Sequence, residues 1–300
     1  MEQTTNRWHR HFDPVTVEQL RGLRLPAPRR SAGKLAGHRR NSRLGGSADF
    51  AQHRQYVPGD DLRLVDWKVF GRTDRYFLKQ REDESNLVCH LAIDISGSMA
   101  YRSSQAPIDK LEAARRWASA VAFVARHQRD GVSLTTFDTE PTLVLPAAHV
   151  SPASIRLVAE TLDRVSAGRE TDLGNVLNSL ASRLPKRGLL IVVSDFLDDV
   201  ESVCEGIRRL AQRDHQLVLV QVSDPAEEDL PWSGPVRLLG MEGESAIEIE
   251  PLAVRRAYRE SRHRMLSALA ETANQLAATW VLVRSDQPIG TQIRQWLAPQ

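Results

Sequence analysis

The stretch LVCHLAIDISGSM at residues 87–99 decides the fold. Its first half, residues 87–93, is mostly apolar, and a short apolar run that ends in turn residues predicts a strand buried on both faces. Its second half, Asp94-Ile95-Ser96-Gly97-Ser98, is a polar turn. In an open α/β sheet, ligands bind beyond the carboxyl ends of the parallel strands, so this turn is the first candidate for a functional site.

Short apolar runs alternate with longer amphipathic runs through the rest of the chain. This alternation indicates strands and helices taking turns around a mostly parallel sheet. Further strands are expected at residues 132–137, 143–145, 189–193, 216–222 and 279–283. Helices are expected at residues 108–128, 151–165, 172–184, 200–213, 252–276 and 289–296. The run LLIVV at 189–193 is too apolar for a half-exposed strand and belongs in the centre of the sheet.

Two regions are expected to depart from this alternation. The turn Asp138-Thr139-Glu140-Pro141 joins the strands at 132–137 and 143–145, which predicts a hairpin. The region from Pro225 to Pro251 is rich in glycine and proline, so we expect loops with one or two edge strands there.

The composition is that of a soluble globular protein, with 300 residues of which 41% are hydrophobic and 26% are charged. No stretch approaches the roughly 18 to 20 apolar residues of a membrane helix, and the first 30 residues lack the apolar run of a signal peptide. The two cysteines, Cys89 and Cys204, lie far apart in unlike surroundings, which favours free thiols and a reducing cytosol. We therefore expect a cytoplasmic protein.

Positive charge is concentrated near the amino terminus, although the net charge is only +2. Residues 19–48 contain eight Lys or Arg, from Arg21 to Arg43, and no Asp or Glu. Such a segment suits nucleic acid, an anionic membrane or an acidic protein surface. Its glycines and prolines favour a flexible, solvated leader over a rigid basic groove.

Polar side chains gather where the predicted strands end. Asp94, Ser96 and Ser98 follow the first strand, Asp195 follows the strand at 189–193, and Thr171 precedes a predicted helix. All five are hard oxygen donors, which Mg²⁺, Mn²⁺ or Ca²⁺ prefer over the His and Cys ligands of zinc. Residues two apart in an extended turn can point the same way, so the side chains after the first strand can converge.

The mixture of donors favours binding over chemistry. With several hydroxyls and few carboxylates, a cation would keep water in part of its shell and would attract an external carboxylate. Thr171 is the expected ligand and Asp172 the expected helix cap, although Thr and Asp compete for both roles.

The pattern Asp94-x-Ser96-x-Ser98, with Thr171 in a second loop and Asp195 after a later strand, resembles the metal-ion-dependent adhesion site of von Willebrand factor A domains. In that family the serines and the threonine bind the metal, and the aspartates act largely through water. The resemblance implies the same roles here, in an α/β domain with a Rossmann-type, mostly parallel sheet and helices on both faces.

A second signature lies before this domain, in residues 50–82. The stretches Tyr56-Val57-Pro58-Gly59-Asp60-Asp61 and Asp66-Trp67-Lys68 are similar to the sequence that precedes the A domain in bacterial proteins accompanying MoxR-type AAA+ ATPases. The resemblance implies a basic leader at 1–45, a family-specific segment at 46–86 that packs on the A domain, and a von Willebrand factor A-like domain at 87–300.

Three functions are compatible with these features. The leading one is a non-enzymatic, metal-dependent adaptor that binds an acidic protein ligand and works with a MoxR-type ATPase. The alternative is a nucleic-acid-binding protein that uses Arg21 to Arg43. A Mg²⁺-dependent phosphohydrolase acting through Asp94 has less support. Such enzymes need a second carboxylate two residues after the first, and this chain has Ser96 at that position. The patterns of serine hydrolases, phosphate-binding loops and zinc hydrolases are absent.

Overall fold

The structure is a computed structural model that describes residues 14–26, 50–56, 65–81, 87–148, 152–168, 170–184, 188–213 and 215–298. The chain divides into two compact units. One consists of Met1–Arg29 with Leu87–Gln300, and the other consists of Arg30–Asn86.

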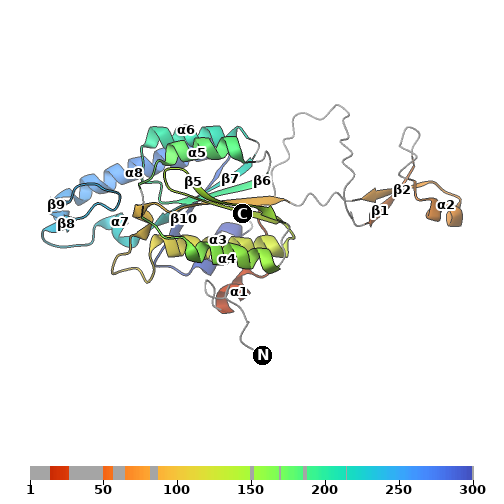
Figure 1. The fold of residues 1–300 in the computed structure, drawn as a ribbon, viewed down its shortest axis with the longest axis horizontal. Helices are drawn as coiled ribbons and strands as arrows, with labels where there is room; N and C mark the ends of the chain where they lie inside the picture. The colour runs from red at the N-terminus through yellow and green to blue at the C-terminus, as the bar shows by residue number, and fades with distance from the viewer. Residues whose placement is uncertain are drawn as a thin grey trace. The chain divides into compact units, whose positions relative to one another are not determined.

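The larger unit is built on a six-stranded sheet (Figure 1). In spatial order its strands are β10 (Thr279–Arg284), β7 (His215–Ser223), β6 (Gly188–Ser194), β3 (Val88–Asp94), β4 (Gly131–Phe137) and β5 (Pro141–Ala148). Neighbouring strands are parallel except for β5, which is antiparallel to β4. The mostly parallel sheet, the hairpin and the central position of residues 189–193 are therefore confirmed.

Helices cover both faces of this sheet, as Figure 1 shows. One face carries α3 (Lys110–His127), α4 (Pro152–Arg164), α9 (Ile289–Leu297) and α1 (Pro14–Leu20). The other face carries α5 (Leu173–Arg183), α6 (Val200–Ala211) and α8 (Pro251–Gln275). These bounds agree with the predicted helices to within a few residues, apart from α1, which the sequence did not predict.

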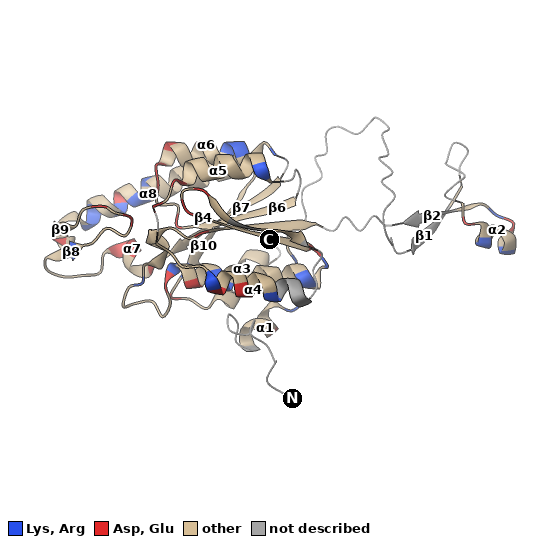
Figure 2. Ribbon diagram, in the orientation of Figure 1, with Lys and Arg blue, Asp and Glu red and all other residues tan. Residues whose placement is uncertain are grey.

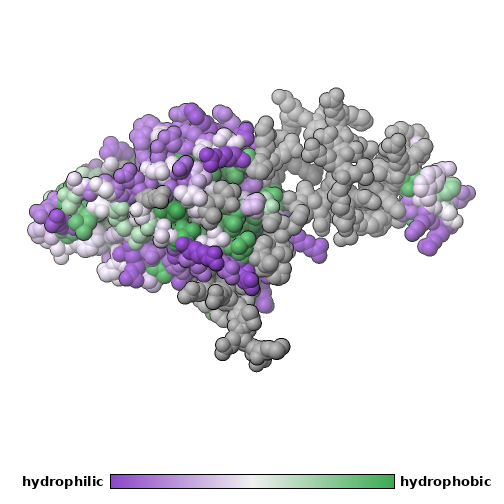
Figure 3. Space-filling view, viewed as in Figure 1, coloured by the Kyte–Doolittle hydropathy of each residue, from purple (hydrophilic) through white to green (hydrophobic). Residues whose placement is uncertain are grey.

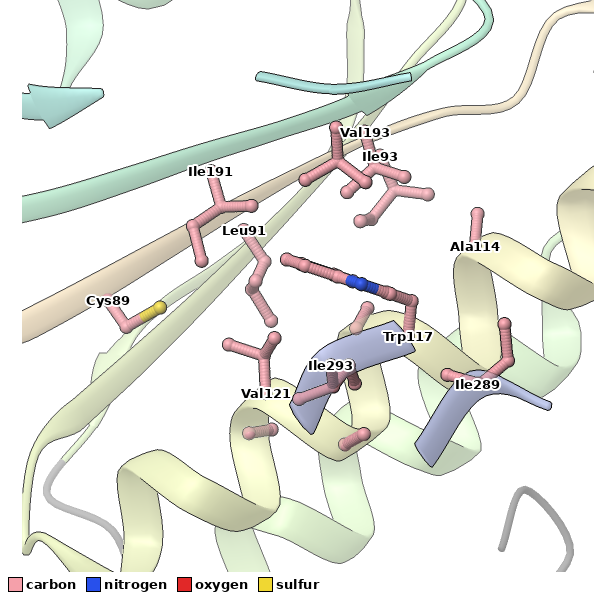
Figure 4. Packing of buried hydrophobic residues seen from close by; sticks show 14 of the residues in the cluster. Cys89, Leu91, Ile93, Ala114, Trp117, Val121, Ile191, Val193, Ile289 and Ile293 are labelled. Atoms are coloured by element: carbon pink, nitrogen blue, oxygen red, sulfur yellow. The ribbon is translucent and has the colours of Figure 1, made fainter. Parts of the chain in front are cut away.

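The central strands are apolar on both faces because each face contributes to a separate core. Leu91 and Ile93 of β3 belong to the core beneath α3, whereas Ala92 between them belongs to the core beneath α5 and α6. Figure 4 shows the indole of Trp117 lying among Leu91, Ile93 and branched residues of β6 and α9. Trp117 has no exposed surface, so the packing of α3 on the sheet is fixed by a large buried ring.

Part of the predicted leader belongs to this core. Leu20 at the end of α1 and Leu25 after it are 2% and 3% exposed, and α1 packs against α9 and α3. The backbone N–H of Leu25 also donates to Gln128 Oε1 at 2.6 Å. The remaining parts of the predicted leader, residues 1–13 and 27–45, lie outside the described residues.

The smaller unit contains a two-stranded antiparallel sheet of β1 (Phe50–Gln55) and β2 (Phe77–Arg81), with α2 (Trp67–Thr73) between them in the chain. The sequence also predicts a strand from Tyr76 to about Gln80, and this strand is confirmed as β2. The sequence predicts a short helix after Pro58, with Leu62, Val65 and Val69 on its apolar face. In the structure α2 begins at Trp67. The Asp66 carboxylate caps it there by accepting hydrogen bonds from the N–H groups of Lys68 and Val69. Residues 57–64 lie outside the described residues, and the packing of this segment on the A domain stays a prediction.

The region after β7 corrects another prediction. It forms a short helix, α7 (Pro225–Asp229), and two three-residue strands, β8 (Val236–Leu238) and β9 (Ile247–Ile249). These strands pair with each other in a separate sheet instead of lying at an edge of the main sheet, whose edges are β10 and β5. The turn between β8 and β9 instead reaches the carboxyl end of the main sheet.

The structure also bears on the cysteines and on the helices long enough to be considered as membrane spans. Cys89 and Cys204 are both free and buried, as expected for unpaired thiols. Within the described ranges, no helix has the length and apolar character needed to cross a membrane.

Candidate metal centre at the carboxyl end of the sheet

The candidate site lies where the strand order reverses. The strands that follow β3 in the chain, β4 and β5, lie on one side of it in the sheet. The later strands β6, β7 and β10 lie on its other side. Asp94 is the last residue of β3 and Asp195 is the first residue after β6, so adjacent strands deliver the two carboxylates to the same end of the sheet. This is the position at which open α/β sheets bind ligands.

Asp94 is 1% exposed and has partners for both carboxylate oxygens. Oδ1 accepts from Ser96 N–H at 2.8 Å, which forms the turn after β3, and Oδ2 accepts from the Ser194 hydroxyl at 2.6 Å. Burial, and then the nearby charge of Asp195, raise the pKa of Asp94, while these hydrogen bonds oppose the shift. Ser194 is a partner that the sequence did not predict.

Ser96 and Ser98 connect the two aspartates. Their hydroxyl oxygens are 3.1 Å apart. The Ser96 side chain lowers the pKa of Asp94 and the Ser98 side chain lowers that of Asp195, in each case against the effect of burial. The convergence expected from their spacing is therefore present in the structure.

Thr171 and Asp172 separate into two roles. The Asp172 carboxylate caps α5 by accepting from Asn175 N–H at 3.1 Å. Thr171 Oγ1 is buried, and among the described residues it has no hydrogen-bond partner. A buried hydroxyl without a partner costs free energy, so this oxygen is available for a ligand that the protein itself does not supply.

Lys110, the first residue of α3, is a buried member of the site that the sequence did not indicate. Its side chain is 0% exposed, and Nζ lies 2.7 Å from Asp195 Oδ2 and 2.5 Å from Glu227 Oε1. Burial alone raises the pKa of Asp195, but the Lys110 ammonium holds it below its usual value. The two carboxylates in turn raise the pKa of Lys110 against the effect of burial. Lys110 therefore remains charged inside the protein.

Glu242, in the turn between β8 and β9, is a second unexpected member. Its Oε1 accepts from Ser98 N–H at 2.9 Å and its Oε2 accepts from Thr171 N–H at 3.0 Å. One carboxylate thus joins two of the loops that carry the predicted metal ligands. No local pattern indicates this role, because Glu242 and Ser98 are 144 residues apart in the chain.

The residues present fit a hard divalent cation. The predicted set combines three hydroxyls with two carboxylates. Only two of the five are carboxylates, and the described residues contain no cluster of three or more His, Cys, Asp or Glu able to hold a metal. Beside the set's own two carboxylates, Asp94 and Asp195, two more lie nearby, Glu227 and Glu242, against the ammonium of Lys110. Such an excess of carboxylates, together with the unpartnered Thr171 hydroxyl, suits Mg²⁺, Mn²⁺ or Ca²⁺.

A cavity of about 680 Å³ opens beside the turn that follows β3. It is lined by Ile95, Asp138, Glu140, Pro141, Thr142, Ser166, Ala167 and Gly168. Ile95 lies between Asp94 and Ser96 in the chain, but none of the five predicted metal ligands lines this cavity.

The sheet order, the helices on both faces and the polar loops at the reversal of strand order define a von Willebrand factor A-like α/β protein. Within that class, the chain belongs to the family described as protein of unknown function DUF58, which matches residues 52–267.

Several known proteins are similar to this chain. Uncharacterised proteins of Mycobacterium tuberculosis strain H37Rv and Mycobacterium bovis are each 26% identical to it over 293 residues, covering 95% of this chain and 88% of theirs. The conserved hypothetical protein BatB from Bacteroides thetaiotaomicron is 19% identical, with a TM-score of 0.48 over 70% of this chain and 96% of its own. The SpRpn10 VWA domain is 12% identical, with a TM-score of 0.43 over 70% of this chain and 94% of its own.

Proposed function

We propose that this protein is a non-enzymatic adaptor that binds a partner protein through a divalent cation held by Asp94, Ser96, Ser98, Thr171 and Asp195. One observation carries the proposal. Three loops bring these hydroxyls and carboxylates together at the reversal of strand order, and Thr171 Oγ1 there has no hydrogen-bond partner among the described residues. Mg²⁺ is the expected cation, with Mn²⁺ or Ca²⁺ as substitutes.

The surroundings of Asp94 support binding over catalysis. Both of its oxygens accept hydrogen bonds, from Ser96 N–H and the Ser194 hydroxyl, and its side chain is 1% exposed. A phosphohydrolase that uses this aspartate as a nucleophile would need a second carboxylate two residues further on as its acid and base, and that residue is Ser96. The phosphohydrolase alternative therefore has less support.

The partner is expected to present a carboxylate. Three of the five proposed ligands are neutral hydroxyls and the Asp195 carboxylate is paired with Lys110, so the set leaves part of a cation's charge for an Asp or Glu side chain of the partner to compensate. A MoxR-type AAA+ ATPase as a working partner rests on the resemblance of residues 50–82 alone. A cytoplasmic location belongs to the same proposal and is supported by the two free cysteines.

Nucleic-acid binding has weaker support. Of the basic segment from Arg21 to Arg43, only Arg21 and Arg24 are described, and Arg21 forms an ion pair with Glu18 at 3.0 Å. Basic and acidic residues are interspersed along α4 and α8 (Figure 2). On α8, Arg256 pairs with Glu260, so the arginines of that helix do not form a free basic face.

Mn²⁺ titration followed by electron paramagnetic resonance tests the proposal, with Ser96→Ala as the site variant. Ser182→Ala is the matched control, because Ser182 is an exposed serine on α5. We expect the wild type and Ser182→Ala to bind one Mn²⁺ alike, and Ser96→Ala to bind at least about 10-fold more weakly. Equal Mn²⁺ binding by wild type and Ser96→Ala would falsify the metal site.

A further inference from the structure

The backbone N–H groups of Ser98 and Thr171 form a seat for one carboxylate. They donate to the two oxygens of the same Glu242 side chain, at 2.9 and 3.0 Å. Two N–H groups that converge in this way recognise a carboxylate by charge and by spacing. Both belong to predicted metal ligands, so the seat adjoins the place where a partner's carboxylate is expected.

The turn that carries Glu242 fits closely onto the turn after β3. A Cβ atom added at Gly97 would overlap Met241 O and would lie 3.0 Å from Glu242 Cγ, so the close approach requires glycine at position 97. Glu242 N–H donates to Glu244 Oε2 at 2.9 Å, which holds the turn in shape. Gly243 has a φ of 101°, a conformation that glycine adopts readily. The turn is thus shaped to present Glu242 to the seat.

The hairpin beneath this turn is weakly anchored. Its strands are three residues each and pair only with each other. Isolated two-stranded hairpins are marginally stable in water. Leu239 is 70% exposed, Met241 42% and Ile247 55%, and Figure 3 shows hydrophobic atoms at the end of the unit where β8 and β9 lie. These exposed side chains belong to the hairpin that carries Glu242, and strands this short hold its turn weakly.

We propose that Glu242 is an internal ligand that occupies the seat intended for the partner's Asp or Glu, so that a partner binds by displacing the turn between β8 and β9. This inference rests on the proposed function, because it assigns the partner's carboxylate to the same site. The external carboxylate forms the hydrogen bonds with Ser98 N–H and Thr171 N–H that Glu242 gives up. If Glu242 occupies the seat about nine tenths of the time, the apparent affinity for an external carboxylate is about 10-fold lower than with an empty seat.

Acetate, used as the carboxylate probe on the full chain loaded with Mn²⁺, tests this competition. The relaxation rate of water protons reports the exchangeable water at bound Mn²⁺, and acetate that reaches the site lowers that rate. Glu242→Ala empties the seat, and Glu242→Gln removes the charge while keeping the size of the side chain. Glu248→Gln is the control, because Glu248 is an exposed carboxylate on β9 of the same hairpin.

We expect acetate to lower the rate in both Glu242 variants at about 10-fold lower concentration than in the wild type or Glu248→Gln. An equal response to acetate in all four proteins, with Mn²⁺ binding still lost in Ser96→Ala, overturns the internal ligand alone. Mn²⁺ binding that Ser96→Ala leaves unchanged overturns the proposed function, and the internal ligand with it.

Discussion

Thr171 and Asp172 are adjacent in the chain, but a substitution at Thr171 should change metal affinity, whereas a substitution at Asp172 should change stability. Thr171→Ala removes a buried hydroxyl that has no hydrogen-bond partner among the described residues, so we expect Mn²⁺ affinity to fall at least about 10-fold and the free energy of unfolding of the metal-free protein to be unchanged or raised. Asp172→Ala removes the cap of α5 and should cost about 1 kcal/mol of stability while Mn²⁺ affinity is unchanged. Mn²⁺ titration and urea unfolding on both variants measure the two quantities. The reverse pattern would assign the metal to Asp172.

Lys110 is the residue whose loss should cost most. Lys110→Met leaves the buried Asp195 carboxylate and the neighbouring Glu227 without their shared ammonium, and we expect a loss of about 3–5 kcal/mol in the free energy of unfolding. Arg116→Met on the same helix is the control. Arg116 is 38% exposed and pairs with Glu112 at the surface, so its loss should cost less than about 1 kcal/mol. Similar losses in urea unfolding for the two variants would contradict the role assigned to Lys110.

Some residues of the candidate site could be predicted from the sequence and others could not. Asp94, Ser96 and Ser98 were predictable because strand position, spacing and resemblance all act within a few residues. Lys110 lies in the first turn of the predicted helix at 108–128 with no pattern to distinguish it, and its partner Asp195 is 85 residues away. Glu242 is 144 residues from Ser98, so only the folded chain joins them. Contacts of this kind leave no periodic pattern in the sequence.

At the scale of elements, the contact between α5 and α6 depends on a glycine. A Cβ at Gly206 would lie 2.7 Å from Leu177 Cβ and 3.2 Å from Gly174 O, atoms that cannot move without moving the helices. We expect Gly206→Ala to lower the free energy of unfolding by about 1–3 kcal/mol, although alanine is the better helix former by about 1 kcal/mol.

Gly71→Ala in α2 is the matched control, because nothing lies within 4 Å of its added Cβ. There the helix propensity alone should act, and the substitution should be neutral or stabilising. Thermal unfolding followed by circular dichroism distinguishes the two outcomes. A stabilised Gly206→Ala variant would mean that α5 and α6 pack less closely than the structure shows.

Elements were predictable where periodicity and burial agree. The strands β3 and β6 are mostly apolar and almost wholly buried, and α3 is amphipathic with clear limits, so the sequence located all three. In contrast, α1 is short, and it is held by packing on α9, which lies at the other end of the chain. The strands β8 and β9 are three residues long, too short for alternation to indicate which sheet they join.

At the scale of the whole molecule, stability should depend on pH through a histidine outside the metal centre. His90 is buried in β3, where its Nδ1 lies 2.6 Å from the Ser133 hydroxyl and its ring packs 5.8 Å from that of His215. Burial, and then the charge of His215, lower the pKa of His90 to about 4. An unfolded chain has a histidine pKa of about 6.5, so it takes up the proton first as the pH falls. His90 therefore contributes stability above about pH 6.5 that is lost as the pH falls towards 4.

Two buried carboxyl groups change stability with pH in the opposite direction to His90. The prediction is therefore made for the difference in stability between the wild type and His90→Gln. Burial raises the pKa of Asp130 to about 6 and also raises that of Asp94, and both carboxyls favour the folded state as the pH falls. We expect the wild type to lose stability relative to His90→Gln by about 1.4 kcal/mol per pH unit between pH 6 and 5. Urea unfolding of both proteins at several pH values measures this difference. His263→Gln, at an exposed position on α8, should follow the wild type, and a His90→Gln variant that also follows it would show that His90 is protonated without cost inside the sheet.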